Sequence, residues 1–232
     1  MNRRQAGPRR HALRGLEILH EDRDVLVVCK EPGLLTNSYD GDRNPTAERL
    51  LTSYLRKGSA RSWIRAFTVH RLDRETSGLL IFAKSAAVQQ HLKDNWKDVE
   101  KRYTAVAHGC LAAKSGRFSG YLVEDADQYV RSTTDAARGK WSETIYRLVG
   151  ETARFSLLDL ALVTGRKNQI RVHLAEAGHP VAGDAKYGLK GDRVARLALH
   201  ARALSFPHPH DGRAMTFEAP VPAAILQLMD GP

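Results

Sequence analysis

The chain has 232 residues, 42% of them hydrophobic and 27% charged, and its 36 Lys and Arg against 26 Asp and Glu give a formal net charge of +10. This composition predicts a soluble globular protein with a real core, and no apolar run approaches the length of a membrane span. The positive charge favours a polyanionic partner, usually nucleic acid, over a basic surface without a partner.

The N-terminal segment, residues 1–16, is rich in arginine but contains no apolar run of signal-peptide length. We therefore expect a flexible basic arm before the folded part of the chain. The two cysteines, Cys29 and Cys110, are far apart and lack metal-ligand spacing. This cysteine usage fits a reducing cytoplasmic environment.

Short strands and helices alternate in the first hundred residues. Residues 16–33 predict two strands around an Asp-rich turn, and residues 78–84, GLLIFAK, predict a buried strand. A helix is expected over 44–58, with Asn44 as its cap and Gly58 at its end. Ser85 is expected to cap a second helix, in which apolar residues recur every four positions up to Trp96.

Strands dominate the second half. The segment 101–109 alternates so that Lys101, Tyr103 and Ala105 share one face of a strand. The segments 142–150 and 153–165 predict a strand pair, and 197–209 with 214–220 predict a hairpin. A helix is expected over 166–178, with Ile170 facing inward, and a short helix over 222–229.

This order of elements defines the expected fold class. Helices arrive between strand pairs rather than after every strand, which favours an α+β fold with a mixed, largely antiparallel sheet flanked by helices over a doubly wound parallel sheet. No composition break divides the chain, so we expect one domain over residues 17–232.

Several familiar catalytic sites are absent from the sequence. It contains no G-x-G-x-x-G turn, no G-x-x-x-x-G-K-[ST] loop, no H-E-x-x-H helix and no G-x-S-x-G elbow. The histidines of the segment 206–212, FPHPHDG, are metal-ligand candidates. We interpret them as loop residues, because partner carboxylates or cysteines are missing nearby in the sequence.

The segment 68–84, TVHRLDRETSGLLIFAK, places Asp73 between Arg71 and Arg74. Three interpretations compete: a surface ion-pair cluster, an RNA-binding face, or a catalytic carboxylate that works on a polyanion. Flanking guanidinium groups favour the ionised carboxylate, and a carboxylate can attack the anomeric carbon of a sugar. Glu75 is the only second carboxylate nearby, and the four-residue charge pattern alone favours the surface ion pair.

A second basic segment, residues 164–188, reads TGRKNQIRVHLAEAGHPVAGDAKYG. Gly165 allows a tight turn into a helix whose first turns would carry Arg166, Lys167 and Arg171. The free N–H groups at such a helix start suit a phosphate. An ordinary basic helix face is the competing interpretation. The occurrence of this segment together with the segment 68–84 favours the functional interpretation.

Together these segments closely resemble the RluA-type family of RNA pseudouridine synthases. The segments EDRDVLVVCKEPGLLT, EKRYTAVAHG and LALHARALSFPHPHDGRAMTFEAPVP are similar to further family motifs, in the family's order. The likeness runs from about residue 17 to about residue 222. Within it, residues 121–142 fit the family pattern loosely and are expected to form variable loops.

The resemblance implies a reaction and the residues that perform it. A uridine in RNA loses its N-glycosidic bond, the base rotates and rejoins the ribose through carbon 5, with no cofactor and no metal. Asp73 corresponds to the family's essential aspartate at the ribose, and Arg71 to the residue that replaces the flipped nucleotide. Tyr103 corresponds to the tyrosine against the target base, Ile170 to an apolar neighbour of the base, and Arg171 to the arginine that pairs with the aspartate.

Further RNA contacts are expected from Arg74, Arg166 and Lys84, although a lysine such as Lys84 more often simply ends a strand. The sequence departs from the family pattern at Glu31, where proline is usual, and at Asn168, where histidine is frequent. We expect a less rigid loop entry from the first departure and an unchanged reaction despite the second.

The expected protein is thus a cytoplasmic, monomeric pseudouridine synthase without an obligate protein partner or an N-terminal accessory RNA-binding domain. Its substrate would be structured RNA, ribosomal or transfer. Two alternatives stay open: an inactive RNA-binding relative that acts as a chaperone or assembly factor, and a hydrolase that cleaves N-glycosidic bonds. The hydrolase would need a second acid or base, which the sequence does not display.

Overall fold

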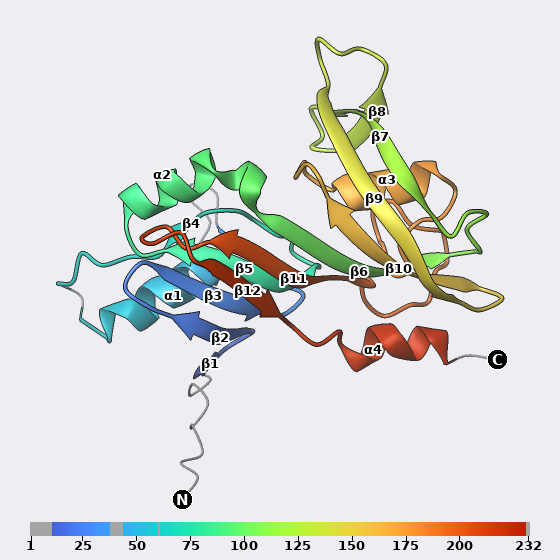
Figure 1. Ribbon diagram of the computed structural model, residues 1–232. Helices are drawn as coiled ribbons and strands as arrows, with labels where there is room; N and C mark the ends of the chain where they lie inside the picture. The colour runs from blue at the N-terminus through green and yellow to red at the C-terminus, as the bar shows by residue number, and fades with distance from the viewer. Residues whose placement is uncertain (1–10, 38–43, 60, 231–232) are drawn as a thin grey trace, which may run out of the picture. The chain divides into compact units, whose positions relative to one another are not determined.

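The computed structural model describes residues 11–37, 44–59 and 61–230 (Figure 1). Its internal contacts divide the chain into two compact units. The first comprises Met1–Trp96 and His208–Gly212, and the second comprises Lys97–Pro207 and Arg213–Pro232. Most of the expected basic arm lies outside the described residues. Its last part contains a short strand, β1 (His11–Leu13), which pairs with the next strand.

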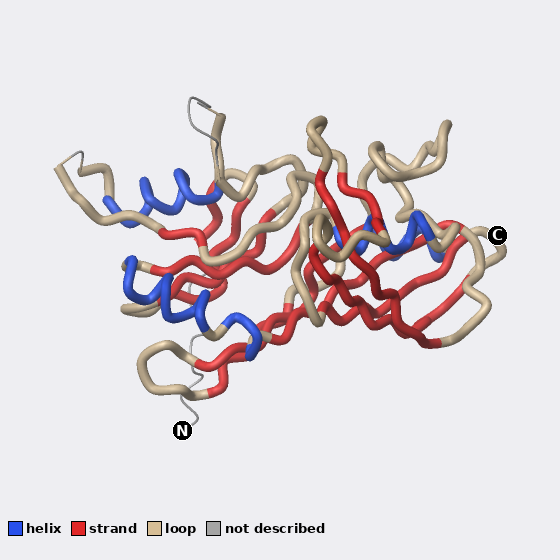
Figure 2. The backbone as a smooth tube through the Cα atoms, turned by 90° about the horizontal axis from the view of Figure 1, so that it is seen from above, coloured by secondary structure: helices blue, strands red, loops and turns tan. Residues whose placement is uncertain are grey.

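The first unit is a small antiparallel sheet with two helices. Strands β1, β2 (Leu16–Glu21), β3 (Val25–Lys30) and β5 (Ser77–Ala83) lie in this order, and β4 (Phe67–Thr68) also pairs with β5. The helices are α1 (Ala47–Arg56) and α2 (Ala86–Asp94), and α2 packs against β4 and β5 (Figure 2, helices in blue). All seven residues of β5 are buried, which confirms the predicted core strand.

The helix ends show how local chemistry sets the boundaries. Ser85 caps α2 as predicted, since its hydroxyl accepts a hydrogen bond from the Val88 N–H at 3.2 Å. The predicted cap of α1, Asn44, is wrong. Thr46 takes this position, with extended backbone and a hydroxyl that accepts from the Arg49 N–H at 3.2 Å. At the other end, Lys57 adopts a left-handed conformation and so terminates the helix.

The second unit is a larger antiparallel sheet. Its strands lie in the order β11-β6-β10-β9-β7-β8, with β12 paired to β11. Their bounds are β6 Glu100–His108, β7 Ser115–Glu124, β8 Val130–Thr133, β9 Lys140–Glu151, β10 Phe155–Leu162, β11 Leu199–Pro207 and β12 Ala214–Glu218. The predicted β9–β10 pair and β11–β12 hairpin are both confirmed.

Four further helical segments belong to this unit or adjoin it. They are α3 (Gln169–Glu176), α4 (Ala223–Leu226), and the 3-10 turns η1 (Trp96–Asp98) and η2 (Gln227–Met229). The short helix expected near the C-terminus is thus present. Among the described residues, no helix is both long enough and apolar enough to cross a membrane. The α+β class predicted from the sequence is confirmed.

The expectation of variable loops over 121–142 was wrong. Strand β7 pairs with both β8 and β9, so this segment forms a three-stranded antiparallel extension of the sheet. Leu122 and Val130 are buried there, and they pack with Val172 of α3 and with Tyr187. The alternation is weak in the sequence because many side chains of β7 and β8 are only partly buried.

Helix α3 is shorter than the predicted helix. Asn168, at its start, has a φ of 54°, so the helical backbone cannot continue toward Arg166. The preceding turn is held by the side chain of Gln169, whose Oε1 accepts from the Arg166 N–H at 2.9 Å and the Thr164 hydroxyl at 2.7 Å. Placing Arg166 and Lys167 in the first helical turns was therefore wrong.

Candidate active site

Asp73 lies in the loop between β4 and β5. Its carboxylate is half-buried, whereas the flanking Arg71 and Arg74 are exposed. The carbonyl of Asp73 accepts a hydrogen bond from the Thr76 N–H at 3.1 Å, which closes a tight turn directly before β5. This turn fixes the backbone of Asp73 at the start of β5, between two cationic residues in the sequence.

A buried threonine fixes the residue before Asp73. The hydroxyl of Thr36 donates to the Leu72 carbonyl at 3.0 Å and accepts from the Leu72 N–H at 3.1 Å. Both residues are buried, with 2% of Thr36 and 5% of Leu72 exposed. One side chain thus satisfies both backbone groups of Leu72, and the loop is tied to a segment far away in the sequence.

A buried lysine fixes the residue after Asp73. Lys30 is fully buried, and its ammonium group donates to the carbonyls of Glu31 at 2.9 Å and Arg74 at 3.0 Å. The Arg74 carbonyl also accepts from the Gly33 N–H at 2.9 Å, and the Arg74 Nε donates back to the Gly33 carbonyl at 3.1 Å. Sequence reasoning missed Lys30 as a site residue; a charged residue ending the apolar run VLVVCK was the available signal.

The departure at Glu31 also has a structural counterpart. The Glu31 N–H donates to the Gly15 carbonyl at 3.0 Å, a hydrogen bond that proline cannot make. A proline ring would restrict the backbone at this position, and in its place the hydrogen bond from Glu31 restrains the backbone against the β1–β2 turn. This contact counts against the expected loss of rigidity at the loop entry.

Arg71 lines a hollow of about 400 Å³ in the first unit. The other lining residues are mainly polar or basic, among them Arg65, Thr68, His70, Gln89 and Lys93. His70 is held in place because its Nε2 accepts from the Ile81 N–H of β5 at 3.1 Å. The hollow therefore begins beside the Asp73 loop and offers several cationic groups to an anion.

The second unit carries the other predicted site residues. Tyr103 lies on β6 between β10 and β11, paired with Leu160 and Ala201, and only 8% of it is exposed. As predicted, it shares a buried face with Lys101 and Ala105. Ile170 is buried in the first turn of α3, with 5% exposed.

Arg171 is held in a buried polar network. Its Nε and Nη2 donate to the two carboxylate oxygens of Asp184, both at 2.7 Å, and the Asp184 side chain is completely buried. Burial alone would raise the pKa of the Asp184 carboxyl, but hydrogen bonds and charge from Arg171 and two backbone N–H groups hold that pKa below its ordinary value. Asp184 thus stays ionised and fixes the plane of the guanidinium.

Asn168 and Tyr187 complete this network. The Asn168 Oδ1 accepts from Arg171 Nη1 at 3.1 Å, and its Nδ2 donates to the Tyr187 hydroxyl at 3.1 Å. The Arg171 guanidinium also lies over the Tyr187 ring, 5.2 Å from its centroid. Asn168 tolerates the left-handed backbone better than most residues, so it combines a helix start with a contact to Arg171.

Three cationic residues lie apart from these networks. The exposed Arg166 donates from Nε to the Trp141 carbonyl at 2.9 Å, and Lys167 pairs with Glu124. Lys167 precedes helix α3, whereas Arg171 lies within it. Lys84 donates to Glu21 at 2.9 Å and to the Asp22 carbonyl at 2.7 Å, which favours its structural interpretation as the end of a strand.

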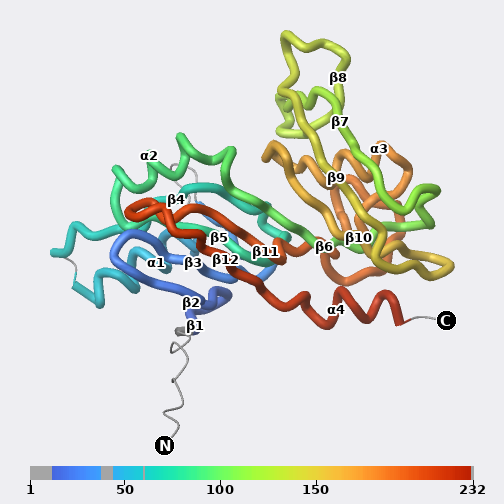
Figure 3. The backbone as a smooth tube through the Cα atoms, in the orientation of Figure 1, coloured from blue at the N-terminus to red at the C-terminus, as the bar shows by residue number. Residues whose placement is uncertain are grey.

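The His-rich segment does meet carboxylates, contrary to the sequence interpretation. It forms the connection between β11 and β12 (Figure 3), and His208 Nε2 lies 3.0 Å from Asp22 Oδ2, which His20 Nε2 also contacts at 2.8 Å. Asp22, Asp24 and His208 are close enough to share a metal ion. Burial opposes the charge of Asp22, but hydrogen bonds from His20, two backbone N–H groups and His208 hold the pKa of its carboxyl well below its usual range. Pairing with Asp22 accounts for His20 and His208, so we interpret this cluster as structural.

The predicted site residues thus divide between the two units. Arg71, Asp73 and Arg74 come together on one loop of the first unit, where Lys84 is engaged elsewhere. Tyr103, Ile170 and Arg171 belong to the second unit, as does Arg166. Residues that sequence reasoning did not find hold the backbone beside Asp73 and the Arg171 guanidinium. They are the buried Lys30 and Thr36 in the first unit, and the buried Asp184 with the partly buried Tyr187 in the second.

Comparisons with known proteins identify the family of the chain. The RNA pseudouridylate synthase family matches residues 24–176. An uncharacterized RNA pseudouridine synthase of Bacillus subtilis, YlyB, is 36% identical over 93% of this chain and 72% of its own length. The ribosomal large subunit pseudouridine synthase D of Neisseria meningitidis serogroup A is 37% identical over 92% of this chain, which spans 60% of that relative.

Solved structures agree on the fold. Human RNA pseudouridylate synthase domain containing 4 has a TM-score of 0.75 at 22% identity, with 90% of both chains covered. Human RNA pseudouridylate synthase domain containing 1 has a TM-score of 0.72 at 25% identity, with 90% of this chain and 86% of that chain covered. The family match extends over both the Asp73 loop and helix α3. The chain therefore belongs to the RNA pseudouridine synthase family, whose enzymes isomerise uridine in RNA to pseudouridine.

Proposed function

We propose that this protein isomerises specific uridines in structured RNA, and that large-subunit ribosomal RNA is its first candidate substrate. The name of the Neisseria relative, which acts on the ribosomal large subunit, supports this choice. The net charge of +10 suits a folded polyanion. Transfer RNA is the second candidate, because it is also a folded polyanion that contains uridine. In this proposal the two units act as one monomeric catalytic domain in the cytoplasm.

The proposed reaction begins with Asp73 at the ribose. Its carboxylate stabilises or attacks the anomeric carbon while the bond from that carbon to N1 of uracil breaks. The detached base rotates, and carbon 5 bonds to the anomeric carbon as the carboxylate leaves. A base then removes the proton from carbon 5, and N1 takes up a proton. No oxidant or reductant is consumed, because substrate and product are isomers.

The remaining residues take supporting roles in the proposal. Arg71 enters the RNA stack in place of the extruded uridine, which lets the enzyme reach an otherwise stacked ribose. Tyr103 lies against the target base and assists removal of its proton, and Ile170 packs near the base. Arg171 pairs with Asp73 and so orients its carboxylate. Arg74 and Arg166 contact phosphate, whereas the ion pair of Lys84 with Glu21 makes Lys84 the weakest of these candidates.

One observation carries the proposal: the backbone on both sides of Asp73 is held by buried side chains from distant segments. Thr36 holds Leu72, and Lys30 holds Arg74. A surface ion pair would not need this, since exposed pairs contribute about 0–1 kcal/mol and tolerate mobility. Catalysis does need it, because a misplaced nucleophile loses rate steeply.

The direct test is to map pseudouridine in total RNA from cells with and without this protein. We expect the loss of pseudouridine at one or a few positions, with restoration by the wild-type gene. Unchanged pseudouridine at every position, together with no product from purified protein on ribosomal or transfer RNA, would favour the RNA-binding alternative. Release of free uracil instead of pseudouridine would favour the hydrolase.

A further inference from the structure

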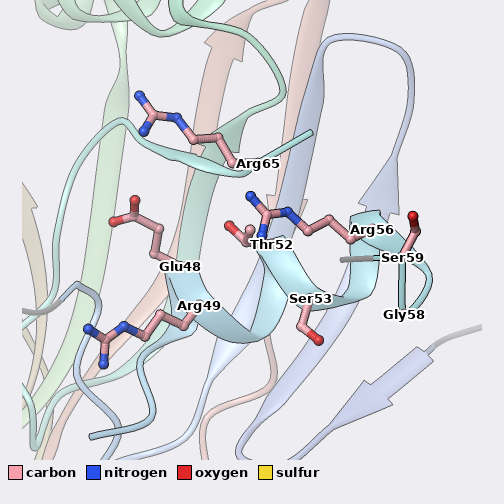
Figure 4. Close-up of a pocket in the computed structure, with 8 residues that line it drawn as sticks. All are labelled: Glu48, Arg49, Thr52, Ser53, Arg56, Gly58, Ser59 and Arg65. Atoms are coloured by element: carbon pink, nitrogen blue, oxygen red, sulfur yellow. The ribbon is translucent and has the colours of Figure 1, made fainter. Parts of the chain in front are cut away.

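A second hollow of about 470 Å³ lies along helix α1, in the same unit as Asp73 (Figure 4). Helix α1, the turn after it, and the extended segment before β4 form its walls. Its lining residues are all polar, charged or glycine: Glu48, Arg49, Thr52, Ser53, Arg56, Gly58, Ser59 and Arg65. None of these residues has a part in the proposed reaction.

The hollow is cationic. Among the described residues, no carboxylate lies within ion-pair distance of Arg49, Arg56 or Arg65. The single carboxylate in the lining, Glu48, accepts a hydrogen bond from the Thr68 hydroxyl at 2.8 Å. Three arginines against one engaged carboxylate leave a net positive surface that favours an anionic ligand.

An exposed tryptophan lies two residues before Arg65, which lines this hollow. Trp63 is 95% exposed and the next residue, Ile64, is 51% exposed. Their loop is tied to the helix, because the Arg56 Nε donates to the Ile64 carbonyl at 2.9 Å and the Ala66 N–H donates to the Thr52 hydroxyl at 3.1 Å. A large indole held in water on an anchored loop is typical of a contact surface rather than of a core.

The hollow adjoins the one beside Arg71. Glu48 and Arg65 line both, and the hollow of about 400 Å³ is also lined by Phe67, His70 and Arg71. Arg65 is held at this junction, with its guanidinium 4.4 Å from the centroid of the Phe67 ring. A positive path therefore leads from the Asp73 loop to Trp63 within one unit.

We propose that this path, named here the α1 groove, binds a single-stranded RNA segment that flanks the target uridine. An unpaired base stacks on Trp63, while Arg56 and Arg65 contact the phosphates of adjacent nucleotides. Stacking on an indole accepts any base, so the groove provides affinity and register without sequence readout. This inference rests on the proposed function, because it takes the bound RNA to be the substrate of the enzyme.

Single-stranded RNA fits these features better than the other occupants. A duplex keeps its base faces stacked inside the helix, so it offers no face to Trp63. A second copy of this chain carries the same net charge of +10, and its arginines would repel those of the groove. The combination of an exposed indole with arginines matches the way proteins bind unpaired strands.

The experiment uses the full-length protein and a labelled 20-nucleotide oligouridine, with a 20-base-pair RNA duplex for comparison. Arg56→Ala combined with Arg65→Ala should weaken oligouridine binding at least tenfold. It should also reduce the slope of log affinity against log salt by about 1.4, because each phosphate contact on a single strand contributes about 0.7. Trp63→Leu should weaken binding about tenfold, whereas Trp63→Tyr should restore most of it, because only an aromatic ring stacks.

Arg23→Ala is the matched control. Arg23 is an exposed arginine in the β2–β3 turn of the same unit and lines neither hollow. Its loss should change oligouridine affinity less than twofold. The groove variants should bind the duplex as the wild type does, and circular dichroism should show that they are folded.

The outcomes separate this inference from the proposed function. Wild-type affinity for oligouridine in the folded Trp63→Leu and arginine variants would overturn the α1 groove, even if the enzyme makes pseudouridine normally. A dimer in sedimentation that Trp63→Leu dissolves, with unchanged RNA binding, would assign the surface to a second copy and overturn it equally. Groove-dependent binding by a protein that makes no pseudouridine would support the groove and refute the proposed function.

Discussion

At the scale of single residues, Asp73 separates chemistry from binding. Asp73→Asn keeps the size of the side chain but removes the charge that the proposed reaction needs. We expect loss of product formation by at least a thousandfold, with RNA affinity within a few-fold of wild type, because phosphate contacts carry most of the affinity. Single-turnover assays and filter binding with the same RNA measure the two effects. Normal turnover by the purified variant would end the nucleophile proposal.

Arg71 distinguishes base flipping from electrostatic support. If Arg71 fills the gap left by the extruded uridine, its loss removes compensation for unstacking, which costs a few kcal/mol. Arg71→Ala should then be slow on a base-paired target and much less impaired when the same sequence lies in a flexible loop. Single-turnover rates on these two RNAs test the prediction. An equal defect on both RNAs would contradict the flipping role and leave Arg71 only an electrostatic role beside Asp73.

The buried pair of Arg171 with Asp184 should contribute strongly to stability. Asp184→Asn removes the buried carboxylate that accepts two hydrogen bonds from the Arg171 guanidinium, so we expect a loss of about 3–5 kcal/mol in the free energy of unfolding. Urea denaturation measures this loss. Arg131→Met is the matched control, because Arg131 is exposed and its pair with Asp125 should contribute at most about 1 kcal/mol. Equal effects of the two variants would show that burial does not distinguish these pairs.

At the scale of elements, the loop before β5 depends on a segment that is remote in sequence. Thr36→Val has nearly the shape of threonine but leaves the buried N–H and carbonyl of Leu72 without partners. We expect a cost of about 1–3 kcal/mol in the free energy of unfolding, together with a lower kcat from the loosened Asp73 loop. Urea denaturation and steady-state kinetics measure both quantities. Thr36→Ser keeps the hydroxyl and should retain most of the activity, so similar defects in both variants would count against this hydrogen bond.

At the scale of the whole molecule, a buried histidine links stability to pH. Burial, with the nearby charges of Arg196 and Arg202, lowers the pKa of His200 to about 4, while a backbone hydrogen bond opposes the shift. The unfolded chain protonates this residue near its ordinary value of about 6.5. Between these values the unfolded state binds more protons, so stability falls as the pH drops from about 6.5 to about 4, by roughly 3 kcal/mol.

Denaturation curves at several pH values test this linkage. The pKa of His200 is about 6.5 in the unfolded chain and about 4 in the folded protein. His200→Gln should therefore reduce the fall in the free energy of unfolding between these two pH values. Part of the slope should persist, because burial also lowers the pKa of His173. The lowered pKa values of Asp22 and Asp184 make a separate contribution that is lost only at lower pH, as these carboxylates become protonated. An unchanged slope in His200→Gln would contradict the prediction.

The sequence by itself determined most elements and the candidates for catalysis. The apolar run of β5, the Ser85 cap and the alternation around Tyr103 depend on local chemistry, so they could be predicted without a structure. The segment around Asp73 and the helix with Arg171 were identified through resemblance, because their short charge patterns alone favour surface ion pairs.

Only the tertiary structure decided what supports those candidates. Lys30 and Thr36 act through hydrogen bonds to residues 36 or more positions away, and Asp184 acts on Arg171 from a separate loop. The starts of α1 and α3 were misplaced, because these helices begin after Thr46 and Asn168, whose backbone angles composition does not specify. Long-range contacts of this kind depend on how distant segments pack, and a local pattern of residues carries no record of that packing.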